Sequence, residues 1–366
     1  MYIRTFIVMK KKLLLRQDMN RLTLFIQTIL IILCCHTLLT SCSNDDATST
    51  EYDGKPLIIL DTDIGSSTDD LFAMEMLYDY QRQGRCTLLG IIIDREGQEN
   101  AALADVMNTY FGFPHLPIAL IREGVKNPKI WIDYKDMPNY THPDGTLMFR
   151  RTLTDYSTLP DGWQLYRQLL AAQPDKSVTI CSTGFVTVLA QLLQSEPDNH
   201  SPLNGVELVR RKVRCLYIMG GVFGNANEII EYNFAQSISY ALTFFDLWPH
   251  DVDIVFSPGE TGDPVEYTPQ QVIADISWTD AHPIKQVYKR CNCNTGQKMW
   301  DPLTVINAVE GDALFHLSPR GTVSINVQAE TRFTATPNGN CRYQLPDNAA
   351  WANHILQKIR DVNKKH

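Results

Sequence analysis

The chain has 366 residues, of which 44% are hydrophobic and 20% are charged, and its formal net charge at pH 7 is −8. This length and composition predict one large α/β domain or two smaller domains, and they exclude a chain that is disordered beyond its ends. The negative charge argues against nucleic-acid binding, because the lysines and arginines beyond the N-terminus are scattered and form no basic stripe.

Residues 1–41 have the features of a secretion signal. An apolar run that follows Arg21 ends in Leu39-Thr40-Ser41-Cys42, which is similar to the lipobox of bacterial lipoproteins. The run has about 18 residues, near the lower limit for a membrane-spanning helix, so such a helix is the alternative. The small residues before Cys42 and the polar tract after it favour a signal peptide, with Met19 as an alternative start.

Cys42 would then carry the lipid, and residues 42–54 would form a polar tether. The sequence therefore predicts a bacterial envelope lipoprotein, periplasmic or associated with the outer membrane, that contacts the membrane through its lipid anchor. Residues 55–366 are expected to form one domain.

Six further cysteines lie in the mature body. Three occupy apolar runs and are expected in the core, namely Cys86, Cys181 and Cys215. The other three leave a disulfide open, because Cys341 has two candidate partners in the polar stretch that contains Cys291 and Cys293.

Apolar runs of strand length alternate with helical patterns along the predicted domain. The runs are continuous, as in strands that are buried on both faces, and they lie at 57–60, 87–93, 117–121, 178–181, 213–219 and 252–256. Helical patterns lie at 71–83, 101–111, 163–172 and 186–194. This alternation predicts an α/β fold with an open, mainly parallel sheet and helices on both faces, with a Rossmann-like core.

Two further regions differ from this pattern. Residues 127–160 are rich in proline and tyrosine and lack periodicity, which predicts a long loop that covers the site. Towards the C-terminus, a helical segment at 303–309 precedes two alternating strands at 322–327 and 332–336, and an amphipathic helix at 348–362 ends the chain.

Four aspartates crowd the end of the first predicted strand, namely Asp61, Asp63, Asp69 and Asp70. In open α/β sheets, this strand end is where ligands bind. Neighbouring carboxylates repel one another and raise one another's pKa, so the cluster needs protons or a hard metal ion. A helix cap is the structural alternative, but a cap uses one carboxylate and leaves the others unexplained. The run therefore predicts a cation site.

Three more motifs fall at strand ends or helix starts. Each is weak alone, and they are Ser182-Thr183-Gly184, the segment from Gly220-Gly221 to Asn225, Glu231 and Asn233, and Trp300-Asp301-Pro302-Leu303. Together with the acidic run, they resemble the inosine-uridine preferring nucleoside hydrolase family over residues 56–343. The resemblance implies calcium-dependent hydrolysis of the N-glycosidic bond of ribonucleosides or related N-ribosides.

The resemblance also implies roles for individual residues. The calcium ligands would be the side chains of Asp63, Asp70 and Asp301 with the carbonyl of Thr183, which together make the all-oxygen shell that calcium requires. Asp63 would also activate the attacking water.

The sugar contacts follow from the same resemblance. Asp69 would hold a ribose hydroxyl, while Asn225, Glu231 and Asn233 would bind the 3′- and 5′-hydroxyls. The substrate is thus a small nucleoside or ribosyl compound, and a homo-oligomer stays open.

The chain departs from the family pattern at three places. The loop between Asp63 and Asp69 is longer than in the best-known members, and Asp94-Arg95-Glu96-Gly97 replaces a usual Gly-Asn pair. Trp300 stands where well-studied members carry the histidine proposed to protonate the leaving base. Its indole can stack on a flat base but cannot act as an acid. Candidate substitute acids are His282, Tyr288 and His142.

Two other functions compete with hydrolysis of a nucleoside. A non-catalytic ribosyl- or nucleoside-binding lipoprotein would keep the metal and sugar sites and lack the leaving-group acid, as Trp300 suggests. A phosphatase of the haloacid-dehalogenase type would use Asp61-Thr62-Asp63 with magnesium, but it leaves Asn225, Glu231 and Asn233 without a role. The natural substrate and its base are not determined by the sequence.

Overall fold

The computed structural model describes residues 54–224 and 230–364. Within them, the strands are β1 (Leu57–Thr62), β2 (Thr87–Ile93), β3 (Ile118–Leu120), β4 (Val178–Ser182), β5 (Val213–Met219), β6 (Asp253–Ser257), β7 (Glu266–Tyr267), β8 (Gln297–Lys298), β9 (Gly321–Ile325), β10 (Thr331–Ala335) and β11 (Cys341–Tyr343). Nine of these described strands form one sheet in the order β10-β9-β11-β6-β5-β4-β1-β2-β3, and β7 pairs with β8 separately.

The large sheet is mainly parallel, as predicted. All neighbours from β3 across β1 and β4 to β11 run parallel, whereas β9 runs antiparallel to both β10 and β11. The chain builds β1, β2 and β3 in one direction and then returns to place β4 on the other side of β1. The topological switch point therefore lies between β1 and β4, where open α/β sheets bind their ligands.

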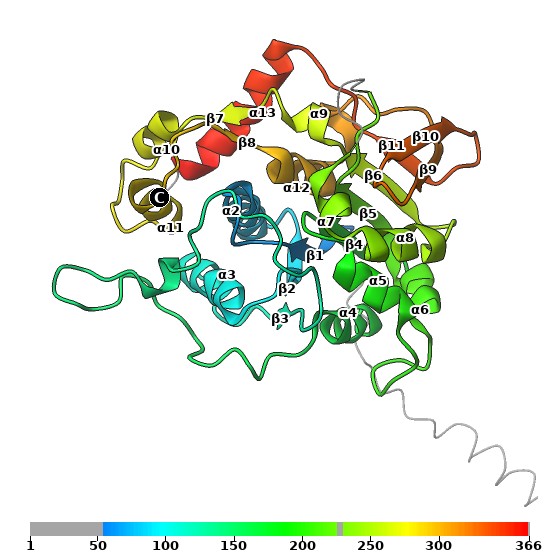
Figure 1. The fold of residues 1–366 in the computed structure, drawn as a ribbon, viewed down its shortest axis with the longest axis horizontal. Coiled ribbons are helices and arrows are strands. Elements are labelled where there is room, and N and C mark those ends of the chain that lie inside the picture. The colour runs from blue at the N-terminus through cyan, green and yellow to red at the C-terminus, as the bar shows by residue number, and fades with distance from the viewer. Residues whose placement is uncertain (1–53, 225–229, 365–366) are drawn as a thin grey trace, which may run out of the picture. The chain divides into compact units, whose positions relative to one another are not determined.

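Helices cover both faces of the sheet (Figure 1). The helices are α2 (Asp69–Arg82), α3 (Gln98–Tyr110), α4 (Gly162–Ala171), α5 (Thr187–Gln194), α6 (Gly205–Lys212), α7 (Tyr232–Gln236), α8 (Ile238–Leu247), α9 (Gly259–Gly262), α10 (Pro269–Asp275), α11 (Pro283–Arg290), α12 (Trp300–Glu310) and α13 (Ala349–Asn363), with short 3₁₀ turns η1 (Met137–Asn139) and η2 (Asp312–Leu314). One face carries α2, α3 and α12, and the other carries α4, α5, α6 and α8.

The position of β1 between two layers of helices explains why its sequence is continuously apolar. Ile58 and Leu60 belong to the core on the face of α2 and α12, whereas Ile59 between them belongs to the core on the opposite face. Successive side chains of a strand point to opposite faces, so a strand between two helical layers needs apolar residues at every position. All three side chains are fully buried.

Most of the predicted elements lie where the sequence placed them. Two strands match to the residue, β2 and β5, and the other predicted strands and helices match within a few residues. The prediction did not delimit α6, the segments from α7 to α11, or the short strands β7, β8 and β11. The long loop is confirmed for residues 127–160, where η1 and one isolated β-bridge interrupt irregular chain.

The predictions about export and anchoring concern residues 1–53, which lie outside the described residues. In the described part of the chain, no helix has the length and apolar character needed to cross a bilayer. The six cysteines of the described body are all free. Cys341 lies in β11 beside β6, whereas Cys291 and Cys293 directly follow α11.

Candidate active site

The ends of β1 and β4 approach each other closely at the switch point. The backbone N–H of Thr183 donates to the carbonyl of Asp61 over 2.7 Å. A Cβ at Gly184 would lie 2.6 Å from the backbone nitrogen of Asp63, so this approach requires a glycine. Gly65 follows with φ of +120°, which turns the chain after β1 into the acidic loop.

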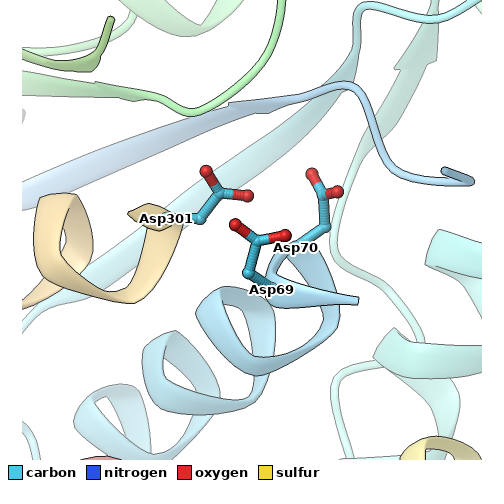
Figure 2. A group of neighbouring side chains, drawn as sticks. All are labelled: Asp69, Asp70 and Asp301. Carbon is cyan, nitrogen blue, oxygen red and sulfur yellow. The ribbon is translucent and has the colours of Figure 1, made fainter. Parts of the chain in front are cut away.

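Three carboxylates converge beside these strand ends. Asp69 and Asp70 lie in the first turn of α2, and Asp301 lies in the first turn of α12. One carboxylate oxygen from each of the three lies within 4.8 Å of the other two (Figure 2). Helix N-termini carry a partial positive charge, so two of them meeting here stabilise part of this negative charge.

Burial makes the remaining charge unfavourable. The three residues are only 2 to 4% exposed. Burial raises the pKa of Asp69 to about 7, and it raises the pKa of Asp70 and of Asp301 well above the ordinary range, with the neighbouring carboxylates adding to both shifts. The hydrogen bond that the Ser67 hydroxyl donates to Asp69 lowers the pKa of Asp69 and offsets only part of this rise.

This donor set fits a hard divalent cation. It consists of carboxylate oxygens, and Thr183 lines the same cavity. Oxygen-rich sites of this kind suit calcium or magnesium. A bound cation would stabilise the charged form of Asp69, Asp70 and Asp301 at neutral pH.

Asp63 has a different partner. The Nη2 group of Arg95 donates to Oδ2 of Asp63 over 2.7 Å, and Nε of the same guanidinium donates to the backbone carbonyl of Asp63 over 2.7 Å. Burial raises the pKa of the Asp63 carboxyl, and the guanidinium of Arg95 opposes that rise. The sequence marked Arg95 as a departure from the family pattern but gave no sign of this ion pair.

Most of the predicted site residues line one cavity of about 600 Å³. Its size is in the range of small-molecule sites. The predicted residues that line it are Asp63, Asp69, Asp70, Thr183, Glu231, Asn233, Trp300 and Asp301. The remaining predicted residue, Asn225, lies outside the described residues.

Glu231 and Asn233 enter the cavity from the start of α7. The carboxylate of Glu231 caps this helix by accepting the backbone N–H groups of Asn233 over 2.6 Å and Phe234 over 3.0 Å. Burial raises the pKa of Glu231 to about 7. The Asn233 amide donates to the carbonyl of Thr183 over 3.3 Å, which links this wall to the end of β4.

Three aromatic side chains also line the cavity, namely Trp131, Tyr232 and Trp300. Trp300 donates its indole N–H to the carbonyl of Gly259 and to Oδ1 of Asp263, each over 3.1 Å. These hydrogen bonds connect the start of α12 to both ends of α9. Trp131 lines the mouth and is 58% exposed. Its loop is tied to the acidic loop, because the backbone N–H of Ile132 donates to the carbonyl of Ser66 over 2.8 Å.

Sequence reasoning missed several residues that line the cavity, among them Trp131, Tyr232, Gln297 and Lys298. A tryptophan in an aperiodic, polar loop was the one available signal. The long loop was expected to cover the site, but no pattern indicated which of its residues face the cavity.

None of the three candidate substitute acids lines the cavity. His282 is fully buried, 3.5 Å from Glu75 and surrounded by aromatic rings. The hydroxyl of Tyr288 contacts the hydroxyl of Thr68 at 3.0 Å, within the core. His142 lies in a turn of the long loop. The structure therefore does not bring these side chains to a leaving group.

A doubly wound sheet with an acidic small-molecule cavity at its switch point defines an α/β protein with a carboxylate cluster that could hold a cation. The chain belongs to a particular family of that class, because the family described as inosine-uridine preferring nucleoside hydrolase matches residues 58–359. It is accordingly an N-glycosidase, a hydrolase that acts on N-ribosyl bonds.

Solved structures share this fold at low sequence identity. The inosine-uridine preferring nucleoside hydrolase from Bacillus anthracis has a TM-score of 0.62 at 18% identity, over 84% of this chain and 99% of that chain. The purine-preferring ribonucleoside hydrolase from Gardnerella vaginalis has a TM-score of 0.60 at 15% identity, over 84% and 99%.

A third neighbour is the type III effector protein XopQ complexed with adenosine diphosphate ribose, with a TM-score of 0.57 at 16% identity over 85% and 94%. At these identities, the neighbours establish the fold alone. A search of curated proteins by sequence finds no match.

Proposed function

We propose that this protein hydrolyses the N-glycosidic bond of ribonucleosides or related N-ribosides with the help of one calcium ion. The observation that carries the proposal is the group of three buried carboxylates, Asp69, Asp70 and Asp301, at the wall of a nucleoside-sized cavity. Bound calcium would orient the ribose hydroxyls and make a bound water more acidic.

The chain's own residues supply the other steps. Asp63 takes a proton from the attacking water as a general base. Glu231 and Asn233 bind ribose hydroxyls from the start of α7. The carboxylates around the sugar stabilise the positive charge that develops on it as the N-glycosidic bond breaks.

The leaving base lies against the aromatic side chains of the cavity in this proposal. Trp300 and Trp131 both line the cavity and offer flat apolar faces, which favour a flat heterocycle. The indole N–H of Trp300 already has two acceptors, Gly259 and Asp263. The leaving group is therefore expected to depart with little protonation by Trp300.

Metal analysis and ribose release test the proposal together. The purified protein should carry about one calcium per chain, lose thermal stability in a chelator and regain it with added calcium, as mass action requires. A panel of nucleosides and p-nitrophenyl riboside should release ribose, and Asp301→Asn should bind no calcium. The metal proposal is contradicted if the purified protein contains no divalent metal and added calcium does not raise its thermal stability. If none of the substrates releases ribose, the result supports the non-catalytic alternative.

We also propose that the protein is anchored through a lipid on Cys42, which would place it at the bacterial envelope. The support is the lipobox-like run that ends at Cys42 and the polar tract after it. The Cys42→Ala variant should no longer be found in the membrane fraction. If the variant stays with membranes and has the mass of the uncleaved chain, the apolar run is a spanning helix.

A further inference from the structure

Gln297 contributes a buried amide to the cavity. It lies in the short strand β8, which pairs with β7, and its side chain is only 9% exposed although it lines the cavity. A side chain on a paired strand is held more precisely than one on a loop. Gln297 is therefore well placed to orient a neighbouring group.

The Gln297 amide uses both of its N–H groups on acceptors of the protein. Nε2 donates to Oδ1 of Asp69 over 3.2 Å and to the backbone carbonyl of Lys298 over 3.0 Å. Neither acceptor can donate, so only one orientation of the amide fits both of them. Since this leaves Gln297 no N–H for a substrate, its effect on the reaction should act through Asp69.

Thr68 supports the other end of this amide. Its hydroxyl donates to Oε1 of Gln297 over 3.3 Å and lies 3.0 Å from the hydroxyl of Tyr288, from which it can then accept. Thr68 directly precedes α2, where a threonine often caps the helix, but its hydroxyl makes no cap hydrogen bond. Thr68 is fully buried and is not among the residues that line the cavity. A chain of hydrogen bonds thus runs from the core through Thr68 and Gln297 to Asp69.

The carboxylate of Asp69 is held from several elements. The Ser67 hydroxyl donates to the same oxygen, Oδ1, that accepts from Gln297. The backbone of Asp301, at the start of α12, also forms a hydrogen bond with this carboxylate. Ser67 belongs to the stretch between Asp63 and Asp69 that is longer than in the best-known family members. These donors together fix the direction in which Asp69 faces the cavity.

We propose that Gln297, supported by Thr68, is a positioning residue that holds Asp69 in the direction in which its carboxylate binds a ribose hydroxyl. This inference deepens the proposed function and rests on it, since the sugar must lie against Asp69. An acceptor that is already oriented binds its ligand at a lower entropic cost. Gln297 should therefore affect recognition of the sugar more than the activation of water by Asp63.

Kinetics with deoxy analogues test this role. With p-nitrophenyl riboside, Gln297→Leu should raise KM about tenfold while kcat stays within about threefold, because a hydrogen bond to a charged group is lost. The preference for the riboside over its 2′-deoxy or its 3′-deoxy analogue should also fall about tenfold, since one of these analogues lacks the hydroxyl that Asp69 binds. A purely structural role would lower kcat/KM for all three substrates alike and leave both preferences unchanged, which overturns the proposal.

Matched substitutions isolate the donor. Gln297→Glu keeps the shape of the side chain and the acceptor for Thr68 but loses the donor to Asp69, so KM should rise at least as much as in Gln297→Leu. Thr68→Val removes the supporting hydroxyl and should raise KM about threefold, whereas Thr68→Ser keeps the hydroxyl and should stay within about twofold of the unmodified protein. The Thr68 pair also decides the question if the Gln297 variants do not fold. Equal KM values for Thr68→Val and Thr68→Ser would then contradict the proposal.

Calcium binding separates a role at the sugar from a role at the cation. In calorimetric titrations of the metal-free protein, Gln297→Leu should bind calcium within about threefold of the unmodified protein, because Gln297 donates to Asp69 alone among the three carboxylates. Calcium binding weakened tenfold or more would assign Gln297 to the cation site and overturn its role at the sugar.

Nucleoside binding separates this inference from the proposed function. If the unmodified protein releases no ribose, the proposed hydrolysis fails, and calorimetric titration with inosine decides the role of Gln297. Inosine binding about tenfold weaker in Gln297→Leu supports that role, and unchanged binding overturns it. If the unmodified protein neither releases ribose nor binds inosine, both proposals fail.

Discussion

Two groups of side chains line the cavity, an acidic wall and an aromatic wall, and they differ in chemistry and in exposure. The acidic wall comes from the end of β1 and the first turns of α2 and α12, and its carboxylates are nearly fully buried. The aromatic wall consists of Trp131 in the long loop, Tyr232 at the start of α7 and Trp300 at the start of α12. Trp131 is more than half exposed.

This difference separates two parts of the chemistry. Buried carboxylates at strand ends and helix starts have strong, directed electrostatic effects, so the acidic wall is suited to the sugar and to water activation. The aromatic wall offers flat surfaces, and none of the proposed substitute acids reaches it. The comparison predicts that substitutions in the acidic wall affect turnover, whereas substitutions in the aromatic wall affect which leaving group is accepted.

The largest effect should come from Asp63→Asn. Loss of a general base typically lowers the rate about 10²- to 10⁴-fold, so kcat should fall by that factor with p-nitrophenyl riboside. Asp263→Asn is the matched control, because Asp263 also lines the cavity, accepts from the indole of Trp300 and can still do so as an amide. Equal kinetics for Asp63→Asn and the unmodified protein would remove the proposed division between the walls.

The second effect concerns the leaving group. Without a placed acid, kcat/KM for p-nitrophenyl riboside should exceed that for inosine or uridine by about 10²-fold or more, the usual contribution of general acid catalysis. Combined substitution of His282, Tyr288 and His142 should leave this ratio unchanged in any variant that folds. A ratio near one would show that an acid on the aromatic wall protonates the base.

A smaller effect is expected for Glu231→Gln. The amide oxygen can still accept a backbone N–H at the start of α7, but the charge that would bind a ribose hydroxyl is lost. Hydrogen bonds to charged groups contribute about 1.5 to 3 kcal/mol, so KM should rise about tenfold or more with little change in kcat. A fall in kcat with unchanged KM would instead place Glu231 in the chemical step.

The smallest effect is a pH dependence of stability in the metal-free protein. Asp69 and Glu231 have a pKa raised to about 7 in the folded state, against about 4 in an unfolded chain. Between these values, the folded protein binds more protons than the unfolded chain, so its stability falls as the pH rises from about 4 to 7.

Thermal unfolding in a chelator should therefore give a melting temperature a few degrees lower at pH 7.5 than at pH 5. Saturating calcium should reduce or reverse this difference, because the ion stabilises the charged carboxylates. A melting temperature that rises with pH in the chelator would contradict the raised pKa values of Asp69 and Glu231.

Much of the acidic wall was predictable because its signals are local. A continuously apolar run indicates a strand buried on both faces, and the aspartates directly after it must lie at the end of that strand. The same reasoning placed Thr183 after β4 and Asp301 at the start of α12. The sequence alone therefore determined the parallel α/β fold, the family resemblance and the edge of the sheet at which the site lies.

Only the tertiary structure decided how these groups are partnered. Asp69 and Asp70 meet Asp301 because α2 and α12 pack together on one face of the sheet, and Asp63 meets Arg95 because β2 lies beside β1. His282, chosen from its residue type, is buried in an aromatic core instead. Sequence patterns specify which edge or face a residue occupies, but the direction and partner of a side chain depend on elements that are distant in the chain.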